Sequence, residues 1–437
     1  MLRFLAGSLF VLAAAAPSTG AGRPGEAAEA PPLGVEAAGI RLPAGFTATL
    51  FADGLGPGRH IVVRENGDVY LALRQPVDGK GVIGLRDVDG DGRADETARF
   101  GATGGTGIAI HDGYLYFSSD VAVFRAKLDA KALAPTGNVE TVVRDFPRQS
   151  AHAAKSIALD DEGRLYVNSG APSNACQERD RTIGSPGMPD CPLLARQGGV
   201  WRFPAGRTGM TQTADGTRFA TGIRNAVALG WNPLAKRIFL LQHGRDQLGQ
   251  LYPDSFTAEQ SARLPAEELH RIEEGSDVGW PYTYWDAFQK ARVVAPEYGG
   301  DGRTKAPAGK YQDPLVAFPA HWGPNAIHFY RGKQLPERYR GGAFVVFHGS
   351  WNRAPYAQEG YNVAFVPFAG GVPSGGWEFF ADGFAGVPVV ENPQNAQHRP
   401  TGIAEGPDGS LYVSDSVKGR IWRIRYTGEA SDGASAR

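Results

Sequence analysis

The chain has 437 residues, of which 42% are hydrophobic and 21% charged, and it carries 59 glycines and 31 prolines. This is the balance of a globular protein with many turns, and therefore with many short strands. The formal net charge is −1, so the protein as a whole has no field that would hold nucleic acid or an anionic membrane. Any electrostatic recognition must come from a local cluster of charges.

The first residues have the pattern of an export signal. Arg3 supplies a positive charge, Phe4 to Ala16 are apolar, and small residues follow up to Ala21, which predicts a cleaved signal peptide over residues 1–21. A membrane anchor is the alternative, but the apolar stretch is shorter than the roughly 20 residues of a spanning helix. The expected location is periplasmic or secreted, with no membrane span after signal cleavage.

The segments that flank the folded part have a simple composition. Residues 22–38 are rich in Ala, Gly, Pro and Glu without apolar periodicity, which predicts a flexible linker. Residues 428–437 are expected to be a disordered tail. The folded domain is therefore expected to span residues 39–427.

The chain has two cysteines, Cys176 and Cys191, in one segment rich in Gly and Pro. In an exported protein such a pair is expected to form a disulfide that closes the loop. Two free thiols are the alternative. Two cysteines alone make a poor metal site.

A short motif recurs along the folded part. It reads Phe-Ala-Asp-Gly from Phe51, with related copies from Phe219 and Phe380 and a looser one at Asp145. After each copy come an apolar strand, a turn and a second strand of the form Gly-x-Leu/Val-Tyr. The second strands lie at 67–70, 113–116, 163–166 and 409–412, and 237–240 and 342–345 fit the same position more loosely.

Six such units predict an all-β protein, a six-bladed β-propeller of four-stranded antiparallel blades. One small sheet cannot bury both of its faces, so the units must pack on their neighbours, and radial closure protects their edges. A sandwich is the alternative, but it does not require six similar units. Helical periodicity is nearly confined to residues 257–270.

The repeat also indicates where polar side chains converge. The start of the innermost strand of each blade and the loop after each second strand lie nearest the axis. The first position holds Arg59, Thr106 with Gly107, His152, Arg224 with Asn225, His321 and Arg399; the second holds Arg74, Asp120, Asn168, Gln242 with His243, His348 and Asp415. This cationic mouth predicts an anionic ligand, since Arg suits carboxylates. A channel of solvated polar groups is the alternative.

Six short motifs occur in order along these units: HAAKSIAL from His152, GIRN from Gly222, QHGRD from Gln242, GWPY from Gly279, FHGSWNR from Phe347 and RPTG from Arg399. Together they resemble the glucose/sorbosone dehydrogenase family of soluble sugar dehydrogenases that depend on pyrroloquinoline quinone (PQQ). The resemblance runs from about residue 40 to 426. It implies a six-bladed quinoprotein that holds PQQ, a tricarboxylate, over the central opening together with Ca²⁺.

The same resemblance implies roles for single residues. His152 is expected to be the general base that takes the proton of the anomeric hydroxyl while hydride passes to the quinone. Arg224 and Asn225 are expected to contact the quinone oxygens, with Arg224 stabilising the charge that develops there. The other expected cofactor-binding residues are Arg59, His243 and Arg399. The expected calcium ligands are the backbone carbonyls of Gly244 and Arg245.

Two positions depart from the soluble glucose dehydrogenases of that family. Ala151 stands where they carry an acidic residue before the catalytic His, and His243 stands where they carry Gln. These differences favour the sorbosone dehydrogenase branch over an enzyme that acts on glucose itself.

A second calcium site is predicted in the segment from Asp87 to Asp95. Asp87, Asp89, Asp91 and Asp95 alternate with other residues, and a glycine allows the loop to wrap a cation. Position twelve from Asp87 is Ala98 rather than the usual Glu. An acidic turn at a blade edge is the alternative. A calcium ion bound here is expected to be structural.

The predicted function is PQQ- and calcium-dependent oxidation of an aldose or an aldehyde sugar such as sorbosone. The sequence has no Cys-x-x-Cys-His haem motif, so electrons are expected to pass to an external acceptor, a soluble carrier or a quinone. A calcium-dependent propeller lactonase or hydrolase and a non-catalytic binding propeller are the alternatives. A lactonase centre needs acidic and Asn metal ligands around the axis, where this chain is mostly basic.

Overall fold

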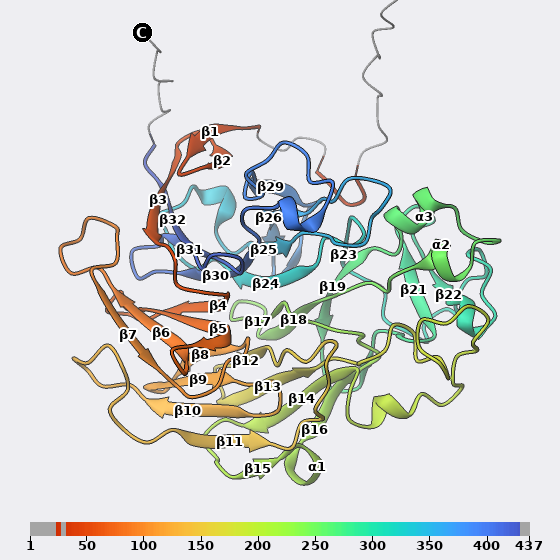
Figure 1. The fold of residues 1–437 in the computed structure, drawn as a ribbon, viewed down its shortest axis with the longest axis horizontal. Coiled ribbons are helices and arrows are strands. Elements are labelled where there is room, and N and C mark those ends of the chain that lie inside the picture. Colours follow the sequence, from red (N-terminus) through yellow and green to blue (C-terminus); the bar gives the residue numbers. More distant parts are fainter. Residues whose placement is uncertain (1–22, 28–31, 429–437) are drawn as a thin grey trace, which may run out of the picture.

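The computed structural model describes residues 23–27 and 32–428. Within these residues the chain forms six sheets of four or five strands and three two-stranded ribbons (Figure 1). The helices are short, namely α1 (Gln212–Asp215), α2 (Leu248–Leu251) and α3 (Ala258–Arg263). The prediction of an all-β protein is confirmed.

Five sheets take their antiparallel strands in chain order. Sheet I contains β4 (Gly58–Val63), β5 (Val69–Val77), β6 (Lys80–Arg86) and β7 (Glu96–Phe100). Sheet II contains β8 (Ile108–His111), β9 (Tyr114–Ser118), β10 (Val123–Lys127) and β11 (Glu140–Arg144), with β15 (Met210–Thr211) added in parallel. Sheet III contains β12 (Ile157–Leu159), β13 (Arg164–Ser169), β14 (Gly199–Pro204) and β16 (Thr217–Thr221), with β20 (Ser276–Asp277) added in parallel.

Sheets IV and V follow the same pattern. Sheet IV contains β17 (Leu229–Asn232), β18 (Arg237–Gln242), β19 (Glu267–Ile272) and β23 (Val316–Phe318). Sheet V contains β24 (Pro324–Phe329), β25 (Ala343–His348), β26 (Tyr361–Val366) and β29 (Glu378–Ala381). The ribbons are β1 (Leu33–Ala37) with β2 (Ile40–Pro43), β21 (Thr283–Asp286) with β22 (Ala291–Val294), and β27 (Phe368–Ala369) with β28 (Val372–Pro373).

Sheet VI joins the two ends of the domain. It contains β30 (Pro400–Glu405), β31 (Leu411–Asp415), β32 (Ile421–Tyr426) and, as its outer strand, β3 (Phe46–Ala52). Strand β3 runs antiparallel to β32, with Phe46 opposite Tyr426. The backbone hydrogen bonds of this pair tie the start of the domain to its end.

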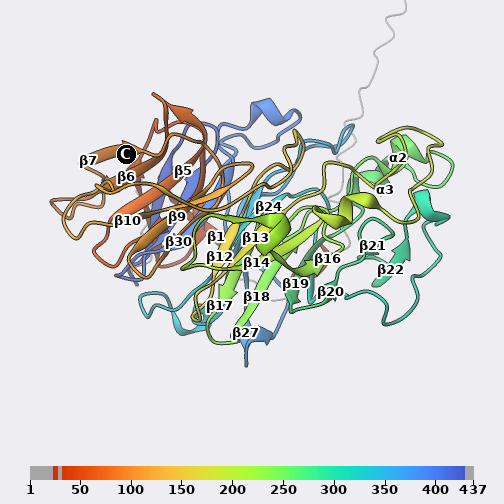
Figure 2. The same cartoon turned by 90° about the horizontal axis from the view of Figure 1, so that it is seen from below.

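The first strands of the six sheets contact one another in ring order. Strand β4 contacts β8, β8 contacts β12, β12 contacts β17, β17 contacts β24, β24 contacts β30, and β30 contacts β4. The sheets radiate from these strands (Figure 1). The second strand predicted in each unit lies in β5, β9, β13, β18, β25 or β31. A lobe that includes α2, α3, β21 and β22 extends to one side (Figure 2).

Buried hydroxyls connect successive sheets. The Ser118 hydroxyl at the end of β9 donates to the carbonyl of Lys155, 2.6 Å away, just before β12. In the same way the Ser414 hydroxyl in β31 donates to the carbonyl of Arg59 in β4, also at 2.6 Å. These bonds fix the backbone at the start of the next first strand, where the sequence places the axial residues.

The structure differs from the sequence prediction in the segment before the domain. Leu33–Ala37, expected to belong to a linker, is strand β1. It is a strand because it pairs antiparallel with β2 across a tight turn. Before it, the Trp377 indole donates to the carbonyl of Pro24 at 2.7 Å. The predicted signal peptide, and the predicted tail beyond residue 428, lie outside the described residues.

The helix predicted over 257–270 is shorter in the structure. It begins with a capping box between Thr257 and Gln260 and ends at Arg263. Pro265 explains the stop, since proline disfavours helical backbone in the residue before it and has no N–H to donate. The residues beyond it form β19 (Glu267–Ile272) instead. No helix in the described part of the chain has the length and apolar character needed to cross a membrane.

Sheet VI offers a test of how the domain is held together. Phe46 is 3% exposed and meets Tyr339, Phe380 and Tyr426 edge to face, with ring centroids 5.5, 5.1 and 5.1 Å apart. We expect Phe46→Ala to lower the free energy of unfolding by about 3–5 kcal/mol, the usual result of removing a buried aromatic ring, in urea denaturation. The matched control is Val88→Ala at a side chain that is 61% exposed, with an expected change within about 0.5 kcal/mol. Equal effects would contradict this account.

Candidate active site

The predicted axial residues come together where the first strands meet. Arg59 lies in β4, and Arg399 immediately precedes β30. The Arg399 guanidinium donates to the carbonyls of His348, at 3.1 Å, and Gly349, at 2.6 Å. Burial, together with the nearby charges of Arg74 and Arg399, lowers the pKa of Arg59 to about 10. Side chains from sheets I, V and VI therefore share one electrostatic environment.

This environment holds more cations than acids. Arg74 is paired with Asp120, with N–O distances of 2.9 and 3.0 Å, whereas neither Arg59 nor Arg399 has a carboxylate partner among the described residues. The Nε of Arg59 is buried and has no hydrogen-bond partner within the described ranges. Buried charges are normally paired, so the centre of the ring is electrostatically prepared for an anion.

His152 precedes β12 with a left-handed backbone, φ 51°. Its Nδ1 lies 2.5 Å from the carbonyl oxygen of Ala171, which can only accept, so Nδ1 carries the proton and Nε2 is an unprotonated acceptor. Burial lowers the pKa of His152 to about 3, with a further contribution from Arg224. The ring is therefore a neutral imidazole held in the tautomer that a proton acceptor at Nε2 requires.

Arg224 forms a buried ion pair with Asp246. The Arg224 side chain is 3% exposed, and its Nη2 lies 2.7 Å from Asp246 Oδ2 while its Nη1 donates to the Gly244 carbonyl at 2.9 Å. Asp246 also accepts from Arg181 at 2.7 Å and from Asn352 at 2.6 Å. Burial alone raises the pKa of Asp246, but Arg224 and its other cationic neighbours hold it well below the ordinary value.

Asp246 is a residue of the site that the sequence analysis did not select. It lies in the QHGRD motif, four residues after Gln242, but a lone acidic residue in a loop has no distinguishing pattern. Its partners come from segments 65 and 106 residues away. Only the folded structure brings them together.

Asn225 and His243 are fixed beside Arg224. The Asn225 side-chain oxygen accepts from Asn168 at 3.3 Å, and its carbonyl accepts from the His243 backbone N–H at 2.8 Å. The His243 Nε2 donates to the carbonyl of Pro324 at 2.7 Å. Burial lowers the pKa of His243 to about 4. Both side chains are thus neutral, ordered groups next to a charged one.

The predicted disulfide between Cys176 and Cys191 is confirmed. The residues just before the loop that it closes contact both candidate catalytic residues, and the Asn174 side-chain oxygen accepts from Arg224 Nη2 at 3.1 Å. Ala171 accepts from the imidazole of His152, and its N–H donates to the Arg224 carbonyl at 2.8 Å. Asn174 donates to the carbonyl of Asp246 at 2.9 Å. These hydrogen bonds hold His152, Arg224 and Asp246 in their positions.

The predicted calcium ligands of the QHGRD motif are partly engaged within the protein. The Gly244 carbonyl accepts from Arg224, as described above. The Arg245 side chain is buried in an ion pair with Glu297. This ion pair limits the movement of Arg245, including its carbonyl. A cation at the Gly244 carbonyl would use the second lone pair of that oxygen and would lie beside the Arg224 guanidinium.

The acidic loop lies in the turn between β6 and β7, away from the axial residues. Asp87, Asp89 and Asp95 each offer an oxygen within 4.8 Å of the others. Asp91 is not part of this group and accepts from the backbone N–H of Arg93 at 2.7 Å. The structure thus brings together three of the four predicted acidic ligands.

Six sheets of mainly antiparallel strands surround a cationic centre that contains a neutral, oriented histidine. The chain belongs to the TrAA12-like family, whose profile matches residues 40–427. The family resemblance predicted from the sequence is thereby confirmed. No comparison singles out the sorbosone branch.

A similar curated protein is the pyrroloquinoline quinone-dependent pyranose dehydrogenase of Coprinopsis cinerea. It is 28% identical over 191 residues, which cover 37% of this chain and 25% of that protein. The curated relatives that this chain matches are covered over less than half of their own length.

Two solved structures share the fold. The holo PQQ domain of the Coprinopsis cinerea pyranose dehydrogenase gives a TM-score of 0.67 at 20% identity, over 88% of this chain and 97% of that one. A calcium structure of the Trichoderma reesei AA12 enzyme gives a TM-score of 0.72 at 19% identity, over 90% and 98%. At these identities the likeness establishes the fold.

The state of His152 can be measured directly. We expect ¹⁵N NMR of the imidazole to show a proton on Nδ1 and none on Nε2, with no protonation between pH 8 and about pH 5, because burial and Arg224 oppose a second charge. His111, the partly exposed last residue of β8, serves as the matched reference in the same spectra. A His152 that titrates near pH 6.5, or that carries its proton on Nε2, would contradict this interpretation.

Proposed function

We propose that the six sheets are the blades of one six-bladed β-propeller, and that this chain is a PQQ-dependent dehydrogenase of an aldose or an aldehyde sugar such as sorbosone. Ring-order contact of the first strands supports the propeller. The observation that carries the function is the presence of Arg59 and Arg399, two partly buried arginines at the axis without carboxylate partners in the described chain. Arg59 and Arg224 both act on His243, and Arg224 in turn acts on the oriented neutral His152.

The residues at the axis fit PQQ. Its carboxylates would take the place of the partners that Arg59 and Arg399 lack, and planar guanidinium forks suit such groups. Burial and the neighbouring cations also hold the pKa of His348 well below its ordinary value, so this side chain adds no further charge. When bound, PQQ supplies a quinone that accepts hydride.

His152 is the proposed general base. Its Nε2 takes the proton of the substrate hydroxyl as the hydride leaves the same carbon with the C–H electron pair, so that the carbon–oxygen double bond forms. A base works best with a pKa near the operating pH, and the pKa of about 3 is low for this task. An anion at the axis offsets Arg224 and raises it. The base is therefore strongest when the cofactor-binding residues are occupied.

Arg224 and Asn225 are the proposed contacts to the oxygen where negative charge develops. Asp246 and Gly244 hold the terminal nitrogens of Arg224, whereas its buried Nε has no partner within the described residues. A preorganised guanidinium stabilises developing charge without reorganising. Asp246 acts through Arg224 and is a positioning residue.

Calcium belongs to the proposal in two places. At the carbonyls of Gly244 and Arg245 it would lie beside the like-charged Arg224 guanidinium, which donates to Gly244, so no step of the reaction is derived from it. In the loop of Asp87, Asp89, Asp91 and Asp95 its role would be structural. The two calcium sites can be distinguished by EGTA treatment followed by calcium addition, in the wild type and in Asp89→Asn. If the activity of both proteins depends on calcium equally, the dependence is assigned to the axial carbonyls.

Electrons from the sugar are proposed to pass to an external acceptor, a soluble carrier or a quinone, and the protein to be exported to the periplasm or secreted. A lactonase remains the second candidate from the sequence. The described residues bring three acidic groups together in the loop between β6 and β7 and not at the axis, which favours the dehydrogenase.

The cationic centre predicts how PQQ affinity responds to mutation. We expect Arg399→Ala to weaken PQQ binding by about 2 kcal/mol, roughly thirtyfold in Kd, because one partner of a charged, hydrogen-bonded contact is lost. Calorimetric titration of the apoprotein measures this. Arg271→Ala, at an exposed position of β19, is the matched control and keeps wild-type affinity. An Arg399→Ala protein with wild-type affinity would remove Arg399 from the site.

The base assignment predicts a selective loss of turnover. We expect His152→Gln to lower kcat by about 10² to 10⁴, the usual contribution of a positioned proton acceptor, while PQQ affinity changes little. His328→Gln, a matched change in β24 at a histidine paired with Glu405, should keep kcat. If His152→Gln loses PQQ, His152 is a cofactor ligand; if it keeps full turnover at every pH, another base such as His243 or Lys155 does the work.

A further inference from the structure

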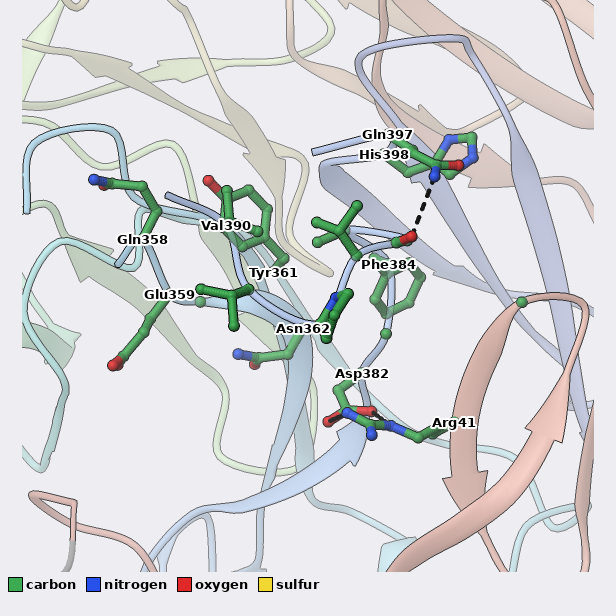
Figure 3. Close-up of a pocket in the computed structure, with 18 of the residues that line it drawn as sticks. Arg41, Gln358, Glu359, Tyr361, Asn362, Asp382, Phe384, Val390, Gln397 and His398 are labelled. Carbon is green, nitrogen blue, oxygen red and sulfur yellow. Dashed lines mark hydrogen bonds and ion pairs between the residues drawn. The ribbon is translucent and has the colours of Figure 1, made fainter. Parts of the chain in front are cut away.

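A large cavity lies between sheets V and VI and the β1–β2 ribbon, and its lining includes neither Arg59 nor Arg399. Its volume is about 760 Å³, within the range of about 300–1,000 Å³ that is typical of small-molecule sites. It is lined by the start of β26, the loop after β29 and the start of β32 (Figure 3).

Tyr361 separates this cavity from the proposed active site. Its hydroxyl donates to the carbonyl of Ser350 at 2.8 Å, and the guanidinium of Arg399 lies 5.5 Å from the centre of its ring. The cavity and the axial site are therefore neighbours that share one aromatic wall. They do not share their charged groups.

The cavity is electrostatically balanced, unlike the axial site. The arginines in its described lining all have carboxylate partners: Arg41 with Asp382 at 2.7 and 2.8 Å, Arg420 with Asp53 at 2.6 Å, and Arg23 with Glu26 at 3.8 Å. A phosphate or carboxylate ligand would find no unpaired cation among these residues. The lining suits a neutral ligand.

Asn362 provides an unused recognition group. It lies in β26 and is 3% exposed, and its side-chain oxygen has no hydrogen-bond partner in the part of the chain that the structure describes. Figure 3 places it between Tyr361 and the Arg41–Asp382 pair. Since buried amides normally have their hydrogen bonds satisfied, a ligand that offers a hydroxyl would meet this requirement.

The remaining lining combines apolar and polar surfaces. Phe384, Val390 and Tyr361 supply buried apolar faces, while Glu359 presents a carboxylate whose side chain is 41% exposed. A pyranose ring has the complementary form, with apolar C–H faces and a rim of hydroxyls that both donate and accept. Convergent polar groups in an apolar pocket are the usual features of such sites.

We propose that this cavity is a second, non-catalytic binding site for a neutral saccharide. The amide of Asn362 bonds a sugar hydroxyl, and the sugar ring packs against the apolar wall that includes Tyr361. The site needs neither PQQ nor a base. The proposal therefore stands apart from the proposed dehydrogenase activity.

Calorimetric titration with methyl β-D-glucopyranoside and methyl β-cellobioside tests the proposal. These glycosides have no free anomeric hydroxyl, so binding is measured without oxidation at that carbon. We expect the wild type to bind at least one of them and Asn362→Val to bind it at least tenfold more weakly. The matched control, Asn138→Val in an exposed loop, keeps wild-type affinity.

Two results would overturn the second site: no binding of either glycoside by the wild type, or equal affinity in Asn362→Val. Because a change in β26 can disturb the sheet, a crystal structure of the wild type with methyl β-cellobioside gives an independent answer. Density in the cavity beside Asn362 supports the proposal, and density confined to the axial site overturns it. Loss of PQQ binding or of sugar oxidation would not change the result of the glycoside titration or of the crystal structure. Failure of the proposed dehydrogenase function can therefore be distinguished from failure of the second site.

Discussion

The buried ion pair between Arg224 and Asp246 is the interaction on which the geometry of the site depends. Around this pair meet the loop after β18, the segment before the disulfide through Asn174, the disulfide-closed loop through Arg181, and the loop after β25 through Asn352. Removing one member of such a pair leaves an uncompensated buried charge and typically destabilises a protein by about 3–5 kcal/mol. Here the same pair also aims the guanidinium that the proposed reaction uses, so stability and orientation have a common origin.

The axial site and the second cavity differ in whether their arginines have carboxylate partners. Around Arg59 and Arg399 the protein keeps partly buried cations without acidic partners in the described residues, an arrangement that opposes folding and favours an anionic ligand. In the cavity behind Tyr361 each described arginine is paired. The contrast explains why we assign a charged cofactor to the first site and a neutral saccharide to the second.

Much of the fold could be predicted from the sequence because it repeats. The pattern Gly-x-Leu/Val-Tyr marked strands in four of the sheets and looser copies marked strands in the other two, and the position before each first strand marked His152, Arg224 and Arg399 as neighbours. Asp246 could not be found this way, since its partners are remote in sequence. Strand β1 was hidden by its Ala and Gly composition, and it is a strand because β2 offers it a pairing edge. Pro265, a local signal, explains the early end of α3.

The central claim, that the cationic axis binds PQQ for hydride removal from a sugar, is tested most directly by a single-turnover experiment. PQQ-loaded protein is mixed without oxygen with a sugar and with the same sugar deuterated at its C1, and the absorbance of the cofactor is followed. The account predicts one reduction per chain, slowed by deuterium because the C–H bond breaks in that step. Failure to bind PQQ stoichiometrically, or binding with no reduction by any aldose or aldehyde sugar, would contradict it.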